Sequence, residues 1–121
     1  MLLKVAFTMF PIHDATRARA FYEGVLGLTR GLASPDGTWT EYDLVDGGCL
    51  ALFKHPDPSA AVAPGGASIA FEVADLDVVA HLRAVDVVIR GDVVQGPRCR
   101  MQNIHDSEGN AIILHQLHHD R

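Results

Sequence analysis

His115 and the acidic residues that could approach it are the side chains best suited to proton transfer in this sequence. Imidazole gains or loses a proton near neutral pH, and His115 lies in the apolar stretch NAIILHQL near the end of the chain. A neighbouring carboxylate such as Glu41 or Glu72 would orient the ring and favour its protonated form, whereas burial alone would favour the neutral form. We therefore take His115 as the candidate acid–base residue. The alternative is a neutral histidine that donates one hydrogen bond to a ligand or to the backbone.

A second group of possible ligating side chains lies at the chain end, where HQLHHD brings His115, His118 and His119 close in sequence. A β-strand would point His115 and His119 to one face and His118 to the other. Three ligands would then not converge on one ion without a bend in the strand. We interpret these residues as tail histidines rather than as a metal site.

The two cysteines, Cys49 and Cys99, are expected to be free thiols, because a domain of this size does not need a disulfide. Arg98 and Arg100 flank Cys99, and nearby cations make a thiol more nucleophilic. In a strand, however, both arginines would point away from the face that carries the cysteine. A structural role is therefore the prediction for Cys99.

The composition favours one soluble globular domain over residues 1–121. The chain is 48% apolar and 21% charged, and it has no apolar run long enough to cross a membrane. The formal charge of −5 is spread along the chain without a basic stripe, so neither nucleic acid nor a membrane is an expected partner. No secretory signal is recognisable at the start, which predicts a cytoplasmic protein. No phosphate-binding loop or nucleophile elbow appears.

The elements that must position these residues form an internal repeat. Lys4–Phe10 reads as a strand, Asp14 as the N-cap of a helix that stops at Gly27, and residues 37–55 as two strands around the Asp46-Gly47-Gly48 turn. Module one covers residues 1–56, and a linker rich in Pro, Ala and Gly covers residues 57–66.

Module two, residues 67–121, begins the same order again. SIAFEV reads as a strand, and Asp75 as the cap of a helix with Leu76, Val79, Leu82 and Val85 on one face. Three strands follow, the last two joined by a turn at residues 107–110. The repeat indicates two similar curled sheets that cannot bury their faces separately.

Three segments of this repeat carry a resemblance to a known family. They are DATRARAFYEGVLGL at the first helix, IAFEVADLD at the start of module two, and DSEGNAIILHQ at the closing hairpin. In this order they resemble the vicinal oxygen chelate superfamily, which includes glyoxalases, bleomycin-resistance proteins and extradiol dioxygenases. The resemblance implies an α+β fold of two paired βαβββ modules. Their curled mixed sheets would surround a cavity for a small-molecule ligand, usually in a homodimer.

Metal-dependent members of that family hold a divalent ion with four His, Gln or Glu ligands, one from each of four corresponding strands. The resemblance assigns these positions here to Phe7, Ala51, Ser68 and Ile113. Phenylalanine, alanine and isoleucine offer no donor atom to a metal ion. We therefore expect the usual metal site to be absent, and we expect no metal and no other cofactor.

Strand alternation extends these positions to a set of side chains on the same faces. Trp39 and Glu41 share a face of one strand, and they would add a stacking surface and a carboxylate if that face is inward. The expected ligand-binding residues are Phe7, Met9, Trp39, Cys49, Ala51, Phe53, Ser68, Glu72 and Ile113. If the protein is an enzyme, we expect His115 and Glu41 to be its catalytic residues.

Three functions fit this description. The first is a binding protein of the bleomycin-resistance type that sequesters a small aromatic or drug-like molecule. The second is a glyoxalase-like lyase or isomerase that uses His115 and a carboxylate, or a metalloenzyme with ligands relocated to positions such as Glu41 and His115. The third is a structural subunit with a vestigial cavity. One fold hosts many functions, so the sequence does not identify the ligand.

Overall fold

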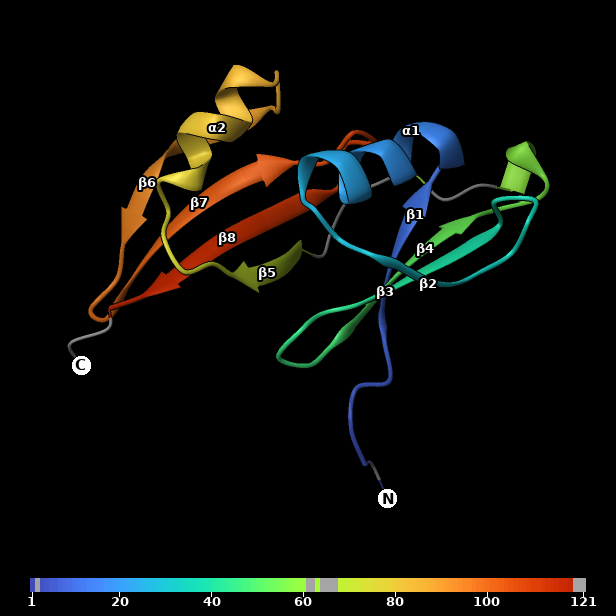
Figure 1. Ribbon diagram of the computed structural model, residues 1–121, viewed down its shortest axis with the longest axis horizontal. Coiled ribbons are helices and arrows are strands. Elements are labelled where there is room, and N and C mark those ends of the chain that lie inside the picture. The colour runs from blue at the N-terminus through green and yellow to red at the C-terminus, as the bar shows by residue number, and fades with distance from the viewer. Residues whose placement is uncertain (2, 61–62, 64–67, 119–121) are drawn as a thin grey trace. The chain divides into compact units, whose positions relative to one another are not determined.

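The computed structural model describes residues 1, 3–60, 63 and 68–118 of the chain. The chain forms two compact units, residues 1–64 and residues 65–121. Each unit is built on one four-stranded sheet (Figure 1). Within the described residues, no helix is both long enough and apolar enough to cross a membrane.

Unit 1 has the order strand, helix, three strands. Its elements are β1 (Thr8–Ile12), α1 (Ala15–Arg19) continued by a π-helical turn η1 (Ala20–Val25), β2 (Arg30–Ala33), β3 (Trp39–Asp43) and β4 (Cys49–Lys54), followed by a short 3-10 turn η2 (Pro58–Ala60). The strands lie in the order β1-β4-β3-β2, with β1 parallel to β4 and the other pairs antiparallel.

Unit 2 repeats this plan. Its elements are β5 (Ser68–Glu72), α2 (Val78–Ala84), β6 (Ile89–Gln95), β7 (Cys99–His105) and β8 (Ala111–Leu117), in the sheet order β5-β8-β7-β6. β5 is parallel to β8, and the other pairs are antiparallel. Two βαβββ modules with mixed sheets confirm the predicted fold class.

The core of unit 1 lies between one face of its sheet and the helical segment. Tyr22 from η1 stacks on Tyr42 from β3 with ring centroids 5.8 Å apart, and both side chains are fully buried. The other buried apolar residues on this side are Phe10, Ile12, Ala18, Phe21, Leu50 and Leu52. Burial of this face sets the register of the sheet, because a slip by one residue would expose every one of its strand residues.

The core of unit 2 uses the equivalent face. Leu76 and Leu82, from the α2 segment, are buried together with Ile104, Ile112 and Leu114 of the sheet. The Leu76 amide donates to the Gln116 side-chain oxygen at 2.8 Å and thereby ties the start of the helical segment to β8.

The first strand differs from its prediction at both ends. It begins at Thr8 rather than Lys4, because Thr8, opposite Leu50, is the first residue that pairs with β4. It also continues through Pro11 to Ile12. Proline is tolerated there because β1 is an edge strand.

The two predicted helix caps have different outcomes. Asp14 is the N-cap of α1, since its side chain accepts a hydrogen bond from the Arg17 amide at 3.0 Å. Asp75 is not the N-cap of α2, which begins at Val78 after Asp77. Instead, Asp75 Oδ1 accepts from the Asp77 amide at 2.9 Å in the preceding turn.

The end of α2 also departs from the predicted helical face. α2 ends at Ala84, so Val85 lies beyond the helix and is exposed, although the sequence predicts it on the buried face. Asp86 then adopts a left-handed conformation with φ 63°, which aspartate tolerates better than most residues.

Gly37 provides a test of this packing. It has φ +82°, and a Cβ added there would lie 2.7 Å from Cβ of Ala15, whereas Gly47 has φ +112° and no atom within 4 Å of such a Cβ. Both substitutions to alanine strain the backbone, but only Gly37→Ala also overpacks. We expect Gly37→Ala to lower the free energy of unfolding by about 1 to 2 kcal/mol more than Gly47→Ala, measured by urea denaturation. Equal losses would contradict the predicted clash.

Candidate functional site

The face of the unit 1 sheet that points away from α1 carries the ligand-binding residues predicted for module one. Directly paired residues of neighbouring strands point to the same side of a sheet. Met9 and Glu41 both lie opposite Ala51, and Trp39 lies opposite Phe53. We call this surface the open face and define it as Phe7, Met9, Trp39, Glu41, Cys49, Ala51 and Phe53.

The open face is accessible, in contrast to the helix-covered side of the same sheet. Phe7 is 46% exposed and Met9 is 45% exposed. Trp39, Glu41, Cys49 and Phe53 are partly exposed, and only Ala51 is fully buried. Two residues of this set, Phe7 and Met9, would leave large apolar side chains in water if nothing bound there.

Aromatic rings form a continuous row on the open face. The Phe7 and Trp39 rings meet edge to face with centroids 5.3 Å apart, and the Trp39 and Phe53 centroids are 6.3 Å apart. His55 extends the row, at 5.8 Å from Phe53. Such rings offer stacking surface at low cost in side-chain entropy.

Glu41 is held in a fixed orientation beside this row. The Trp39 indole Nε1–H donates to Glu41 Oε2 at 2.7 Å, and the Cys49 thiol makes a long contact of 3.9 Å with Oε1. Burial raises the pKa of the Cys49 thiol, and the negative charges of Glu41 and Asp43 raise it further. Cys49 therefore stays a neutral thiol at physiological pH.

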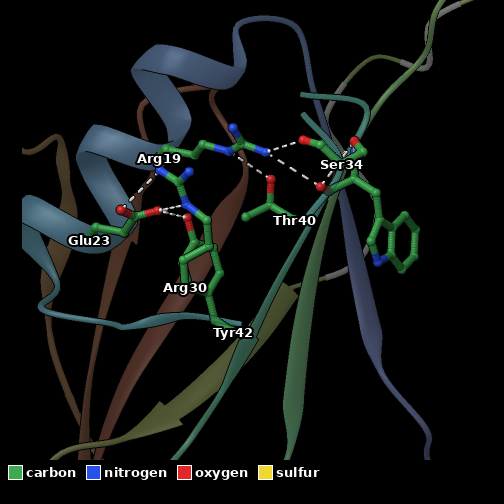
Figure 2. Close-up of polar contacts among 7 residues, drawn as sticks. Arg19, Glu23, Arg30, Ser34, Thr40 and Tyr42 are labelled. Atoms are coloured by element: carbon green, nitrogen blue, oxygen red, sulfur yellow. Dashed lines mark hydrogen bonds and ion pairs between the residues drawn. The ribbon is translucent and has the colours of Figure 1, made fainter. Parts of the chain in front are cut away.

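A polar network on the other side of the sheet anchors the helical segment, as Figure 2 shows. Arg19 Nε donates to Thr40 Oγ1 at 3.0 Å, and its terminal nitrogen donates to the Ser34 carbonyl at 3.2 Å and to the Trp39 carbonyl at 3.5 Å. Arg19 therefore helps to fix the backbone that carries Trp39. This role of Arg19 was not predictable from the sequence, because nothing in its helical spacing reports a contact with a strand residue 21 positions further along the chain.

The second part of this network joins Glu23, Arg30 and Tyr42 (Figure 2). Arg30 Nε donates to Glu23 Oε2 at 2.7 Å, and the Tyr42 hydroxyl donates to the same oxygen at 2.9 Å. The hydrogen bond from Arg30 lowers the pKa of Glu23, and burial raises the pKa of Tyr42.

This arrangement predicts a pH dependence of stability. A carboxyl group with a lowered pKa in the folded state stabilises the fold above its unfolded pKa, and this contribution is lost as the pH falls through the folded pKa. We expect the free energy of unfolding to fall below about pH 4.5, and Glu23→Gln to make this fall shallower. Asp36, whose pKa is lowered to about 2 by hydrogen bonds from Thr38, should keep its own contribution in that variant. Urea denaturation of the unsubstituted protein and of Glu23→Gln, repeated between neutral and acid pH, measures these changes. If the free energy of unfolding falls equally steeply with pH in the two proteins, the role of Glu23 is contradicted.

The corresponding face of unit 2 carries a histidine–carboxylate pair. Glu72 and His115 lie opposite each other on β5 and β8. Glu72 Oε1 lies 2.5 Å from His115 Nδ1, and Glu72 Oε2 accepts from the Leu117 amide at 2.9 Å. The carboxylate is thus fixed by the backbone and orients the ring, and this contact leaves Nε2 as the ring nitrogen available to a ligand.

Of the two carboxylates considered as partners of His115, Glu72 makes the contact within unit 2. Glu41 belongs to unit 1 and has its own contacts with Trp39 and Cys49. Ser68 and Ile113 lie on the same face as the pair. Ser68 is four residues before Glu72 on β5, and Ile113 is two residues before His115 on β8, so alternation along each strand points them to the same side.

The remaining candidates are the two cysteines and the histidines near the end of the chain. Cys49 and Cys99 are free thiols. Arg100 points to the helix side, where it donates to the Gln116 side chain at 2.7 Å, as the alternation around Cys99 predicts. The His118 amide continues the β7–β8 ladder by donating to the Arg98 carbonyl at 2.9 Å, and His119 lies outside the described residues.

The positions that the resemblance assigns to metal ligands do not fit a divalent ion. Phe7 packs its ring on Trp39, Ala51 is fully buried, and Ile113 has no donor atom, so only the Ser68 hydroxyl could coordinate. Within each unit, the part of the chain that the structure describes brings together no group of three or more His, Cys, Asp or Glu side chains suited to a metal ion.

Comparison with known proteins gives one family and many similar folds. The family model described as Glyoxalase/Bleomycin resistance protein/Dioxygenase superfamily matches residues 4–114. No curated protein sequence matches the chain.

Among solved structures, lactoylglutathione lyase from Agrobacterium tumefaciens is 20% identical, with a TM-score of 0.74 over 93% of this chain and 92% of that chain. A glyoxalase/dioxygenase from Nostoc punctiforme is 20% identical, with a TM-score of 0.74 over 94% and 90%. The fosfomycin resistance protein FosX from Mesorhizobium loti is 18% identical, with a TM-score of 0.68 over 96% and 93%. At these identities the likeness concerns the fold.

Proposed function

The chain belongs to the glyoxalase/bleomycin resistance protein/dioxygenase superfamily, and from this premise we propose that it binds a small organic molecule, as bleomycin-resistance members do. The observation that carries the proposal is the open face of unit 1, where an accessible row of aromatic rings lies beside one oriented carboxylate. Small-molecule sites are mostly apolar surfaces with a few placed polar groups, and the open face has this composition.

We further propose that binding does not use the divalent ion of the metal-dependent members. The support is chemical: Phe7, Ala51 and Ile113 cannot donate to a metal, and in unit 1 the Phe7 ring instead extends the aromatic row. The protein would then gain binding energy from apolar contact where its metal-dependent relatives gain it from coordination.

We also propose a homodimer as the functional form. Unit 2 exposes Val88, Val93 and Val94 on and beside β6, and exposed apolar side chains favour association. Light scattering at several protein concentrations would measure the mass. A monomer at all concentrations would contradict this proposal and leave the binding proposal unaffected.

Trp39 makes the binding proposal directly testable, because it is the only tryptophan in the sequence. A ligand of the open face is expected to change Trp39 emission and to raise the melting temperature in the same concentration range. Phe53→Ala should weaken the binding of each such ligand, whereas Val45→Ala, at the exposed hairpin turn, should not. A set of small aromatic molecules that changes neither signal would contradict the proposal.

A second candidate function is acid–base catalysis, which the contact between His115 and Glu72 favours. In this case His115 Nε2 would move a proton of the substrate, and Glu72 would hold the ring in place. Lactoylglutathione, named for one structural relative, is a suitable probe.

Under this second function, His115→Ala should lower kcat for lactoylglutathione by about 10²- to 10⁴-fold with KM nearly unchanged. Glu72→Gln, which keeps a hydrogen-bonding side chain, should cause a smaller loss. If the protein only binds ligands, His115→Ala should change affinity by about 0.5 to 1.5 kcal/mol, the contribution of one hydrogen bond. A chromatographic assay that follows the conversion of lactoylglutathione decides between catalysis and binding alone. No conversion by the unsubstituted protein would eliminate this second function for that substrate.

A further inference from the structure

The charges on the open face are of one sign. Glu41 lies in the middle of the face, and Asp43 follows on the same side of β3, opposite Cys49. The basic residues of unit 1 that the strand register places are on the helix side: Arg30 lies opposite Tyr42, and Lys54 lies opposite Ile12. An anionic ligand on the open face would therefore meet carboxylates rather than cations.

His55, at the end of the aromatic row, does not change this balance. Its Nδ1 accepts a hydrogen bond from the Asp57 amide at 3.0 Å, which requires that this nitrogen carries no proton. This nitrogen therefore offers no N–H to an anionic ligand in this arrangement, and the rings of Phe7, Trp39 and Phe53 carry no charge.

Glu41 retains capacity to bind a cation. A carboxylate can accept about four hydrogen bonds. The Trp39 indole N–H supplies one strong bond to Oε2, while the contact of Cys49 with Oε1 is long and weak. Among the residues that the structure describes, no Lys, Arg or His side chain forms an ion pair with Glu41.

The neighbouring rings suit the same kind of ligand. Aromatic rings offer a flat apolar surface on which the apolar part of a ligand can pack. The centroids of Phe7 and Phe53 lie 5.3 Å and 6.3 Å from that of Trp39, whose N–H is bonded to Glu41. A cation bound to Glu41 would thus be next to an aromatic ring and would carry its apolar part along the row.

We propose that the ligand of the open face is an organic cation, a protonated amine attached to an aromatic or other apolar group. The ammonium group binds Glu41, and the apolar group packs on Phe7, Trp39 and Phe53. This inference rests on the proposed binding function and specifies the chemical class of its ligand.

The test uses three probes that share one ring and differ in charge: benzylamine, which is protonated at neutral pH, benzyl alcohol, and phenylacetate. Each is titrated into the full chain while Trp39 emission is recorded. The variants are Glu41→Gln, which removes the charge on the open face, and Asp46→Asn, which removes a charge at the exposed β3–β4 turn. Benzylamine titration of the unsubstituted protein is repeated at high salt, so that the test does not depend on the variants alone.

We expect benzylamine to bind about tenfold more tightly than benzyl alcohol, and phenylacetate to bind least. Glu41→Gln should abolish the preference for benzylamine, and Asp46→Asn should preserve it. High salt should weaken the binding of benzylamine and leave that of benzyl alcohol unchanged.

The outcomes separate the two proposals. Equal affinities for the three probes, or a preference for benzylamine that survives Glu41→Gln, would overturn the inference of a cationic ligand while binding itself stands. If no probe binds, as when a second copy of the chain covers the open face, the inference and the proposed function both fail.

Discussion

Trp39→Ala is expected to weaken benzylamine binding by about 30-fold or more, the largest loss for any single substitution on the open face. Trp39 combines three roles there: its ring contacts Phe7 and Phe53, it offers a surface to the ligand, and its N–H orients Glu41. Calorimetric titration measures the loss, because the substitution removes the fluorescent reporter. Circular dichroism would verify that the variant remains folded.

Trp39→Phe is the matched control for this prediction. It keeps an aromatic ring in the row but removes the hydrogen bond from the indole N–H to Glu41 Oε2. The expected loss is about tenfold or less, because stacking is retained and only the orientation of the carboxylate is relaxed. Unchanged affinity in Trp39→Ala would mean that ligands bind elsewhere on the protein.

Leu52→Ala is expected to lower the free energy of unfolding by about 2 to 5 kcal/mol. Leu52 is 0% exposed on β4, where it lies between Phe10 of β1 and Thr40 of β3 on the helix side of the sheet. Removing its side chain leaves a cavity that close-packed neighbours fill only in part. Urea denaturation measures the change.

Val45→Ala is the control for Leu52, since it shortens an apolar side chain in the same unit at a position that is 99% exposed. Its effect should stay within about 0.5 kcal/mol. Similar losses for the two variants would contradict the assignment of Leu52 to the core, and with it the division of the sheet into a helix-covered side and an open face.

Strand alternation predicted which residues of β3 and β4 share the open face, whereas their role in ligand binding stays a prediction. The period of two along β4 relates Cys49, Ala51 and Phe53, and the same period along β3 relates Trp39 and Glu41. Such relations hold within any strand whatever its partners are. The closing hairpin was predictable for a similar reason, because the turn at residues 107–110 fixes the register of the strands on either side of it.

β2 was not predicted from the residue pattern. Its sequence, Arg30–Ala33, contains a glycine and has no apolar alternation, and its pairing with β3 shifts between Arg30 and Ala33. An edge strand of this kind is held by the backbone of its neighbour. Its side chains therefore need no pattern.

Long-range side-chain contacts were also beyond the sequence pattern. Alternation suggested that Glu72 and His115 share a face, but both Glu41 and Glu72 remained possible partners of His115. The parallel pairing of β5 with β8 sets Glu72 opposite His115, although 43 residues separate them in the chain. Nothing local in either strand encodes that register.

Binding of a small molecule on the open face without a metal ion can be observed at the Trp39 indole N–H resonance. One tryptophan gives one such signal. Two-dimensional NMR spectra would be recorded during benzylamine addition in the presence of a metal chelator. We expect the indole signal to shift progressively, together with the backbone signals of Met9, Glu41 and Phe53. An indole signal that stays in place, or that moves only after a divalent ion is supplied, would contradict this expectation.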